Sequence, residues 1–134
     1  MSREVLAETT VYKAEWDSRG FPVFTWKKFS AGDTFRDGAR HWEEIMGDRG
    51  VERYIVNTSG VTAHDDDDLQ WLEETWIPDL IDMGIRYGAG VYADSVIAEM
   101  EMEKVEDRLS GIHPEYKFRV FGTEDEATEW LQQV

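Results

Sequence analysis

The sequence predicts a single α/β domain over residues 1–134, with a five-stranded, mostly parallel sheet that begins with an N-terminal antiparallel hairpin. About four helices are expected to pack on this sheet, in the order β-β-α-β-α-β-α-β-α. The strongest observation is that the last third of the chain alternates between short apolar runs and segments with helical spacing. Two further observations are a helical apolar repeat over residues 35–46 and two β-rich segments that flank a turn near the N-terminus.

The segments near the N-terminus predict the hairpin. Thr9–Trp16 alternates and is rich in β-formers, Asp17–Gly20 has the composition of a turn, and Phe21–Trp26 follows as the returning strand. Pro22 is tolerable because it lies near the start of its strand. We expect residues 1–8 to be a loose lead-in outside the sheet.

Two helices are predicted on either side of a short buried strand at Val51–Asn57. The first begins near the capping residue Ser30. Its inward face is expected to consist of Phe35, Ala39, Trp42 and Met46. The second begins at the acidic run Asp65–Asp68 and ends near Gly84. Its apolar stripe consists of Leu69, Leu72, Trp76, Leu80 and Met83. Pro78 lies within this stripe and predicts a kink or a restart of the helix.

A strand and a third helix are predicted next. The strand is Ile85–Ala93, in which Gly88 and Gly90 permit the close approach of a helix or of another backbone. Asp94 or Ser95 is expected to cap the helix that follows. The apolar side of this helix is expected to consist of Val96, Ile97, Met100, Lys104, Val105 and Leu109, with the glutamates mainly outside.

The chain is predicted to end with the strand Tyr116–Phe121 and the helix Thr123–Gln133. Thr123 and Glu126 have the spacing of a capping box, in which each side chain satisfies a free backbone amide of the other. The inward residues of this helix are expected to be Ala127, Trp130 and Leu131. Each crossover between parallel strands should be right-handed.

Composition limits the function classes. The absence of Cys excludes disulfides, thiol nucleophiles and thiolate metal sites. The formal net charge is −15, with 29 acidic against 14 basic residues, and this balance predicts adaptation to a salty, halophilic cytoplasm. The only adjacent basic pair is Lys27-Lys28, so we expect neither a nucleic-acid partner nor binding to anionic lipid. Without a long apolar segment or a signal peptide at its N-terminus, the chain is expected to be cytoplasmic, with no membrane insertion.

No pattern in the chain is typical of a catalytic or metal site. His64 with Asp65–Asp68 offers suitable donors for a divalent cation, but four consecutive acids on a helix point in four directions. No Ser lies in the Gly-x-Ser-x-Gly turn of a hydrolase, and the glycines of residues 84–90 do not form a phosphate-binding loop. An enzyme would have to use His64, Asp65 or Glu74, the last because it lies beside Trp71. We assign no catalytic residue, no metal and no cofactor.

Three stretches resemble small STAS-like proteins, whose fold is shared in broad architecture by anti-sigma-factor antagonists and by lipid-carrier domains of the CRAL-TRIO type. They are the acidic-aromatic helix Asp68–Pro78, the strand of small residues Tyr87–Tyr92, and the strand, acidic turn and helix of Phe118–Leu131. The predicted element order is also similar. The resemblance covers most of the chain and implies a STAS-like fold, but a fold does not by itself transfer a function.

The resemblance does not extend to the phosphorylation site of the antagonists. Those proteins accept phosphate on a Ser or Thr in an Asp-Ser-Ser/Thr-Gly-like turn at the start of a helix. The corresponding region here, Thr58–Asp65, lacks this motif, and an acid lies near the position of the phosphoacceptor. Thr58, Ser59 and Thr62 are merely hydroxyls in the vicinity.

Besides an enzyme, two functional hypotheses remain open. The first is a non-enzymatic STAS-like interaction or regulatory module that binds another protein, or a second copy of itself. Its contact surface would be the loop Thr58–His64 and the helix after it, with Trp71 and Trp76 as candidate anchors. The second is a carrier for a small hydrophobic ligand. Its aromatic pocket would be lined by Trp42, Trp71, Trp76 and Tyr92. The candidate ligand-binding or partner-binding residues are Thr58, Ser59, His64, Trp71, Trp76 and Tyr92.

Overall fold

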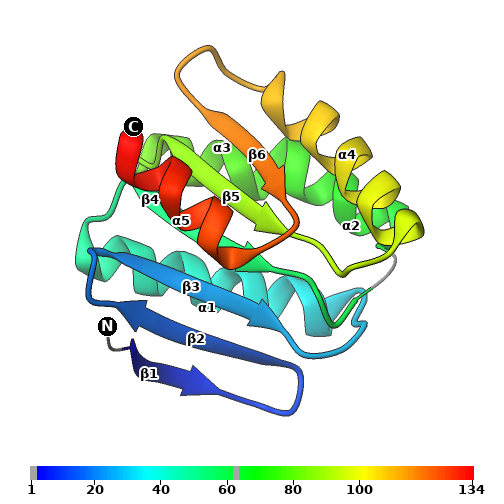
Figure 1. Ribbon diagram of the computed structural model, residues 1–134, viewed down its shortest axis with the longest axis horizontal. Helices are drawn as coiled ribbons and strands as arrows, with labels where there is room; N and C mark the ends of the chain where they lie inside the picture. Colours follow the sequence, from blue (N-terminus) through cyan, green and yellow to red (C-terminus); the bar gives the residue numbers. More distant parts are fainter. Residues whose placement is uncertain (1–2, 62–63) are drawn as a thin grey trace.

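One mixed sheet of six strands, in the order β1-β2-β3-β4-β5-β6, organises the computed structural model, which describes residues 3–61 and 64–134 (Figure 1). The strands are β1 (Arg3–Glu8), β2 (Tyr12–Asp17), β3 (Phe21–Trp26), β4 (Arg53–Asn57), β5 (Tyr87–Val91) and β6 (Lys117–Phe121). The first three are antiparallel to one another, and β3 to β6 are parallel. The predicted α/β class and the N-terminal hairpin are confirmed, and the sheet has one strand more than predicted.

The additional strand is β1, so the predicted loose lead-in at residues 1–8 is wrong for its described part. Arg3 lies opposite Asp17, and Glu8 lies opposite Lys13, with a bulge between Val5 and Ala7. The bulge breaks the two-residue alternation by which a strand is recognised in a sequence. Pairing with β2, which is a tertiary contact, therefore defines this strand.

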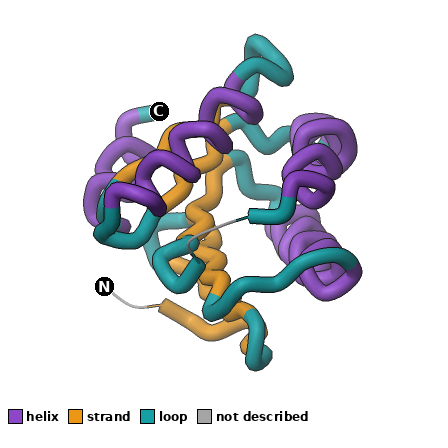
Figure 2. The backbone as a smooth tube through the Cα atoms, turned by 90° about the vertical axis from the view of Figure 1, so that its right-hand side faces the viewer, coloured by secondary structure: helices purple, strands orange, loops and turns teal. Residues whose placement is uncertain are grey.

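Four helical segments pack on the two faces of the sheet. They are α1 (Asp33–Arg49), the rod formed by α2 (Asp66–Trp71), η1 (Leu72–Trp76) and α3 (Ile77–Asp82), then α4 (Val96–Ser110) and α5 (Glu124–Gln133). In Figures 1 and 2, α5 covers one face alone and the other helices cover the opposite face. This segregation follows because successive right-handed crossovers that advance in one direction along a sheet place their helices on the same side.

The larger core lies beneath the helices of the crowded face, and α1 contributes the predicted residues. Phe35, Ala39, Trp42 and Met46 are all buried. The Trp42 ring stacks on Phe24 with a centroid distance of 4.7 Å, and Trp26 stacks on Phe35 at 5.0 Å. The smaller core beneath α5 consists of Phe21, Val23, Ile55, Ala89, Val91, Ala127 and Leu131. Trp130 packs partly buried against it.

Pro78 causes the predicted restart of the second helix. The segment η1 just before it is a π-helical turn, and the Ile77 amide donates to the Leu72 carbonyl five residues back. Such a widened turn accommodates a residue that has no amide hydrogen and whose ring would clash with the preceding turn. The predicted stripe is buried except for Met83, which is exposed beyond the end of α3.

The glycines of β5 confirm the predicted close approach. A Cβ atom at Gly88 would lie 2.7 Å from the Tyr54 hydroxyl oxygen and 2.8 Å from that of Tyr116. A Cβ atom at Gly90 would lie 2.9 Å from Cε of Met102, which comes from α4. A side chain at Gly88 would collide with two buried phenols, so glycine is required there for the observed packing. At Gly90, a Cβ atom would force the flexible end of Met102 to shift.

The predicted orientation of α4 is wrong. Its buried residues are Ala98, Met102, Val105 and Leu109, whereas Val96 and Ile97 are each 73 % exposed and Met100 is 55 % exposed. At about 100° per residue, Val96 and Met100 lie roughly opposite Val105 and Leu109 on the helix, so the predicted apolar side combined residues from two faces. Ser95 is the cap, because its hydroxyl accepts from the Ala98 amide at 3.1 Å.

Side chains of α4 also form hydrogen bonds with backbone groups on the outer edge of the sheet, at β6. The Val120 amide donates to the Glu106 carboxylate at 2.8 Å, and the Ser110 hydroxyl donates to the Phe118 carbonyl at 2.9 Å. These backbone groups point away from β5, where no strand follows. Exposed strand edges are templates for aggregation, and this one is covered by a helix.

Candidate functional site

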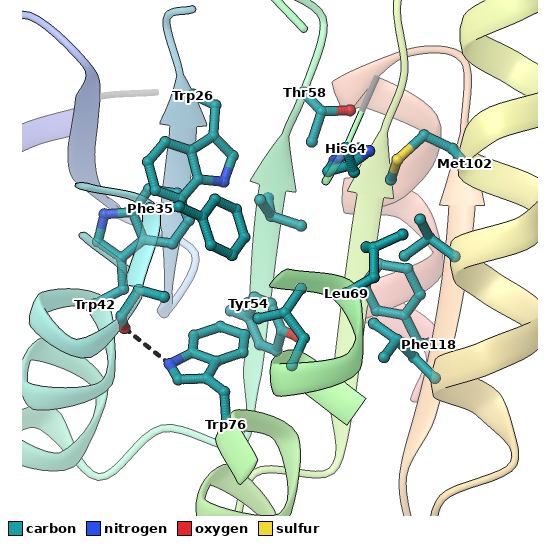
Figure 3. A pocket seen from close by; sticks show the side chains of 15 residues that line it. Trp26, Phe35, Trp42, Tyr54, Thr58, His64, Leu69, Trp76, Met102 and Phe118 are labelled. Atoms are coloured by element: carbon teal, nitrogen blue, oxygen red, sulfur yellow. Dashed lines mark hydrogen bonds between the residues drawn. The ribbon is translucent and has the colours of Figure 1, made fainter. Parts of the chain in front are cut away.

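A small cavity lies where β3 and β4 end, between the sheet and the helices of the crowded face (Figure 3). In parallel sheets, ligands bind preferentially at the carboxyl ends of the strands, and this position makes the cavity a candidate site. The cavity measures about 40 Å³. Its walls consist of Trp26, Phe35, Ala39, Trp42, Tyr54, Val56, Thr58, His64, Leu69, Leu72, Trp76, Met102, Val105, Leu109 and Phe118.

The cavity is apolar and small. The Tyr54 hydroxyl pairs with Tyr116 at 2.8 Å, and the Thr58 hydroxyl donates to the Val91 carbonyl. Among the described residues, the His64 imidazole and the Trp42 indole nitrogen are the lining groups with a buried polar atom that has no partner. On this measure a water molecule needs about 10–15 Å³, so the space accommodates about three of them. Pockets for drug-sized ligands measure about 300–1,000 Å³, and a ligand of that size would require the walls to move.

His64 lies at the edge of this cavity, beside Thr58 and Met102 in Figure 3. Burial lowers the pKa of its imidazole, and the Glu101 carboxylate opposes that shift in part. The ring is therefore neutral at pH 7. Its Nδ1 atom is buried and has no hydrogen-bond partner among residues 3–61 and 64–134. A second hollow of about 10 Å³ shares His64 and is lined by polar groups, including Ser30 and Asp65.

Of the hydroxyl-bearing residues after β4, Thr58 is buried and Ser59 is exposed. Thr58 is 2 % exposed, and both its amide and its hydroxyl donate to the Val91 carbonyl, at 2.7 and 2.8 Å. These two hydrogen bonds join the ends of β4 and β5, and the Thr58 hydroxyl proton is therefore already donated within the fold. Ser59 is exposed, and its amide donates to the Asn57 side chain at 2.8 Å. Thr62 lies outside the described residues.

The acidic run at the start of α2 contains two structural carboxylates. Asp65 caps the helix by accepting from the Asp68 amide at 3.2 Å. Asp68 is itself buried, and it accepts from the Gly32 amide at 3.0 Å and from the Arg36 guanidinium at 3.2 Å. Sequence reasoning missed the role of Asp68, because the partners that bury it come from a distant segment. In the described part of the chain, no three His, Asp or Glu side chains are arranged to hold a metal ion.

The three aromatic candidates do not meet in one pocket. Trp76 lines the cavity with 5 % exposure, and its indole nitrogen donates to the Ala39 carbonyl at 2.8 Å. Trp71 lies outside the cavity, with the guanidinium groups of Arg36 and Arg40 over its ring at 5.5 and 5.2 Å. Tyr92, just beyond β5, is partly exposed and is also outside the cavity. Trp42 and Trp76 are thus the two members of the predicted aromatic pocket that line the observed one.

The three side chains considered for an enzyme, those of His64, Asp65 and Glu74, share no hydrogen bond among the described residues. The Asp65 carboxylate caps α2, and Glu74 is exposed and accepts from Gln70 at 3.0 Å. Among the described residues, these three side chains do not place a nucleophile beside a base.

A surface feature of the same edge is an exposed apolar cluster on α4, formed by Val96, Ile97 and Met100, which we call the α4 patch. Phe29 is 53 % exposed in the loop that follows β3, at the same end of the parallel strands. Sequence reasoning assigned the α4 patch to the core. The available signal was that α4 has apolar residues on two opposite faces, of which one helix can bury only one against a sheet.

Comparison with family models, with curated proteins and with solved structures found no match to this chain. The structure itself establishes an α/β fold with a six-stranded mixed sheet, and the comparisons identify no family. Within the described residues, none of the helices combines the length and the apolar character needed to cross a membrane.

Proposed function

We propose that this protein is a non-enzymatic, STAS-like interaction module that binds another protein at the carboxyl edge of its parallel strands. The element order, antiparallel strands followed by a parallel sheet with three crossover helices on one face, supports the STAS-like assignment. The docking surface is centred on the α4 patch. This proposed surface does not use Trp71 and Trp76, because Trp76 is in the core and the guanidinium groups of two arginines lie over Trp71.

The exposure of the α4 patch is the observation that carries this proposal. Val96, Ile97 and Met100 contribute nothing to the core, which α4 fills with its opposite face. Large apolar side chains clustered on a surface are typical of an interaction site, whereas isolated ones are common and need no explanation. Burial of each such side chain by a partner would contribute about 1.5–3 kcal/mol to binding before the entropic cost of association.

A site-specific photo-crosslinker tests the proposal. The crosslinking residue replaces Ile97, and the protein is irradiated in an extract of the cells that naturally produce it. We expect discrete products in which this chain is joined to another protein. Excess unlabelled wild-type protein should suppress these products, whereas the double variant Val96→Ser/Ile97→Ser should not compete.

The matched control places the same crosslinker at Val5, an exposed valine on the edge strand β1. Equal products from both positions would show unspecific contact, and the proposed surface would be wrong. A product with twice the mass of this chain would assign the α4 patch to a second copy instead.

A small-ligand carrier is the second candidate, favoured by the apolar cavity at a position where ligands bind in parallel sheets. Loading would require the flexible Met102, Leu69 and Leu72 side chains of the wall to move, because the present space is about 40 Å³. Native mass spectrometry in a volatile salt, on protein purified at high KCl, should then show a retained small molecule. A bare polypeptide mass in every preparation would exclude the carrier.

A further inference from the structure

The charges around the α4 patch, which are mostly negative, indicate what kind of partner would fit there. Asp94, Glu99, Glu101 and Glu103 all lie within the first turns of α4 or just before it. The first basic residue of the helix is Lys104, which follows Met100 by four residues and lies on the same exposed face as the patch. The exposed apolar side chains are thus bordered by four carboxylates against one basic residue, and the local balance of charge is negative.

The acidic border continues from α4 toward α5. Tyr92, just before the patch, has a raised pKa, chiefly through desolvation and then through the negative charges of Glu99, Glu126, Glu103 and Glu106. Glu126 belongs to α5, on the other side of the sheet edge from α4. Carboxylates of two helices therefore act on one surface residue beside the patch.

We propose that the partner at the α4 patch is a basic amphipathic helical segment of another protein, whose apolar face covers Val96, Ile97 and Met100 while its Lys or Arg residues meet the surrounding carboxylates. This inference rests on the proposed function and names its partner class. A helix that lies in an apolar site with a charged rim is a recurrent mode of peptide recognition. Complementary charge selects the partner and accelerates its association.

Two other occupants fit the surface less well. A second copy would bring the same four carboxylates against the first set, and each copy carries a formal net charge of −15. An anionic membrane would repel the patch for the same reason, even though its apolar side chains would suit a lipid interface. Only a partner with positive charge satisfies both the apolar centre and the acidic border.

Three synthetic helical peptides of about 18 residues provide the probes, long enough to be helical when bound. The first has leucines on one face and lysines on the other, the second keeps the leucines but has glutamates in place of the lysines, and the third keeps the lysines but has serines in place of the leucines. Binding is measured by fluorescence anisotropy at about 0.15 M and about 2 M KCl, and the contact surface by NMR chemical-shift changes.

We expect the lysine–leucine peptide to bind at least about tenfold more tightly than either of the others. The variant Val96→Ser/Ile97→Ser should lose about tenfold or more in affinity, because it removes the apolar centre without changing charge. The variant Glu99→Gln/Glu103→Gln should weaken binding several-fold at low salt, with a smaller difference at high salt. Its matched control is Glu44→Gln/Asp48→Asn, which removes two exposed charges from α1 and should change affinity little.

The outcomes separate this inference from the proposed function. Equal binding of the leucine peptides with lysine and with glutamate would overturn the basic partner but would leave a docking surface in place. Equal binding of the two lysine peptides, or equal loss in the α1 control, would show unspecific attraction to an acidic protein and would overturn the inference. Dimers in sedimentation velocity that disappear in Val96→Ser/Ile97→Ser would assign the patch to a second copy.

Discussion

Tyr54 and Tyr116 share a hydrogen bond of 2.8 Å between their hydroxyl groups inside the largest apolar cluster of the protein. Both side chains are fully buried, and desolvation raises the pKa of each phenol, so both remain neutral at physiological pH. Each hydroxyl has the other as its hydrogen-bond partner. The pair fits beside β5 because Gly88 has no side chain that would collide with the two phenols. The stability of this part of the core therefore depends on a pair and not on two independent residues.

This dependence predicts strong coupling in a double-mutant cycle. Tyr54→Phe or Tyr116→Phe alone should lower the free energy of unfolding by about 1–3 kcal/mol, because one buried hydroxyl loses its partner. The double variant should be less destabilised than the sum of the two singles, since it removes both polar groups. Urea denaturation measures all three, with Tyr87→Phe as a partly exposed control. Additive losses would contradict the pairing.

Asp17 predicts how the fold responds to acid. Its buried carboxylate accepts from Arg19 at 2.8 and 2.9 Å and from Arg3 at 3.0 Å. The hydrogen bond from Arg19 is the main cause that lowers the pKa of Asp17 well below its usual range, while burial opposes it. Because the folded pKa is below the unfolded value of about 3.9, the stabilisation is present above about pH 4 and is lost as the pH falls further.

Asp17→Asn should therefore lower the free energy of unfolding at pH 7 by about 2 kcal/mol, since hydrogen bonds to a charged group are lost. The difference from the wild type should shrink as the pH falls below about 4, where the wild type loses the same contribution. Thermal unfolding from pH 7 to pH 3 measures the effect, with the exposed Asp48→Asn as a control. A difference that grows in acid would contradict the assigned role.

At the scale of single elements, the protection of the outer edge of β6 by α4 can be tested directly. Glu106→Ala leaves the Val120 amide without its acceptor, whereas Glu106→Gln retains an oxygen that can accept the same hydrogen bond. We expect the alanine variant to aggregate faster on mild heating, because an unpaired strand edge is exposed, and the glutamine variant to behave like the wild type. Light scattering measures both. Equal aggregation of the two variants would indicate a charge effect instead of an edge effect.

The sequence allowed most elements to be predicted where one period was clear. Phe35, Ala39, Trp42 and Met46 repeat on one face of α1, and the structure buries all four. Strand β1 could not be predicted because its bulge removes the alternation and its pairing with β2 is tertiary. The face of α4 was misassigned because two apolar stripes compete, and the structure buries the one with Ala98, Met102, Val105 and Leu109.

The candidate site was less predictable than the fold. Thr58, His64 and Trp76 were singled out in the sequence, and the structure brings them to one cavity. Trp71 was not distinguishable from Trp76, since the arginines that cover it come from α1, far away in the sequence. The α4 patch was not predicted, because apolar residues on a helix are normally expected to face the core. Only the packed structure shows that these residues lie on the surface.

At the scale of the whole molecule, the net charge of −15 predicts a strong dependence on salt. Unscreened carboxylates repel one another in dilute buffer, whereas molar salt reduces the Debye length to about 3 Å. We expect the melting temperature to rise steeply with KCl between low and molar concentration, as measured by circular dichroism. Uncharged sucrose at matched osmolality is the control. A flat response to KCl would contradict the predicted salt adaptation.

Helix α4 joins three tasks in one rigid segment. One face roofs the cavity through Met102 and Val105, Glu106 holds the amide of β6, and the outward face carries the α4 patch. A ligand that pushed the roof upward, or a partner that pulled the helix outward, would at the same time uncover a strand edge that can recruit other chains. A large displacement of this helix should therefore promote association between chains through β6, whereas a small one should leave the edge covered.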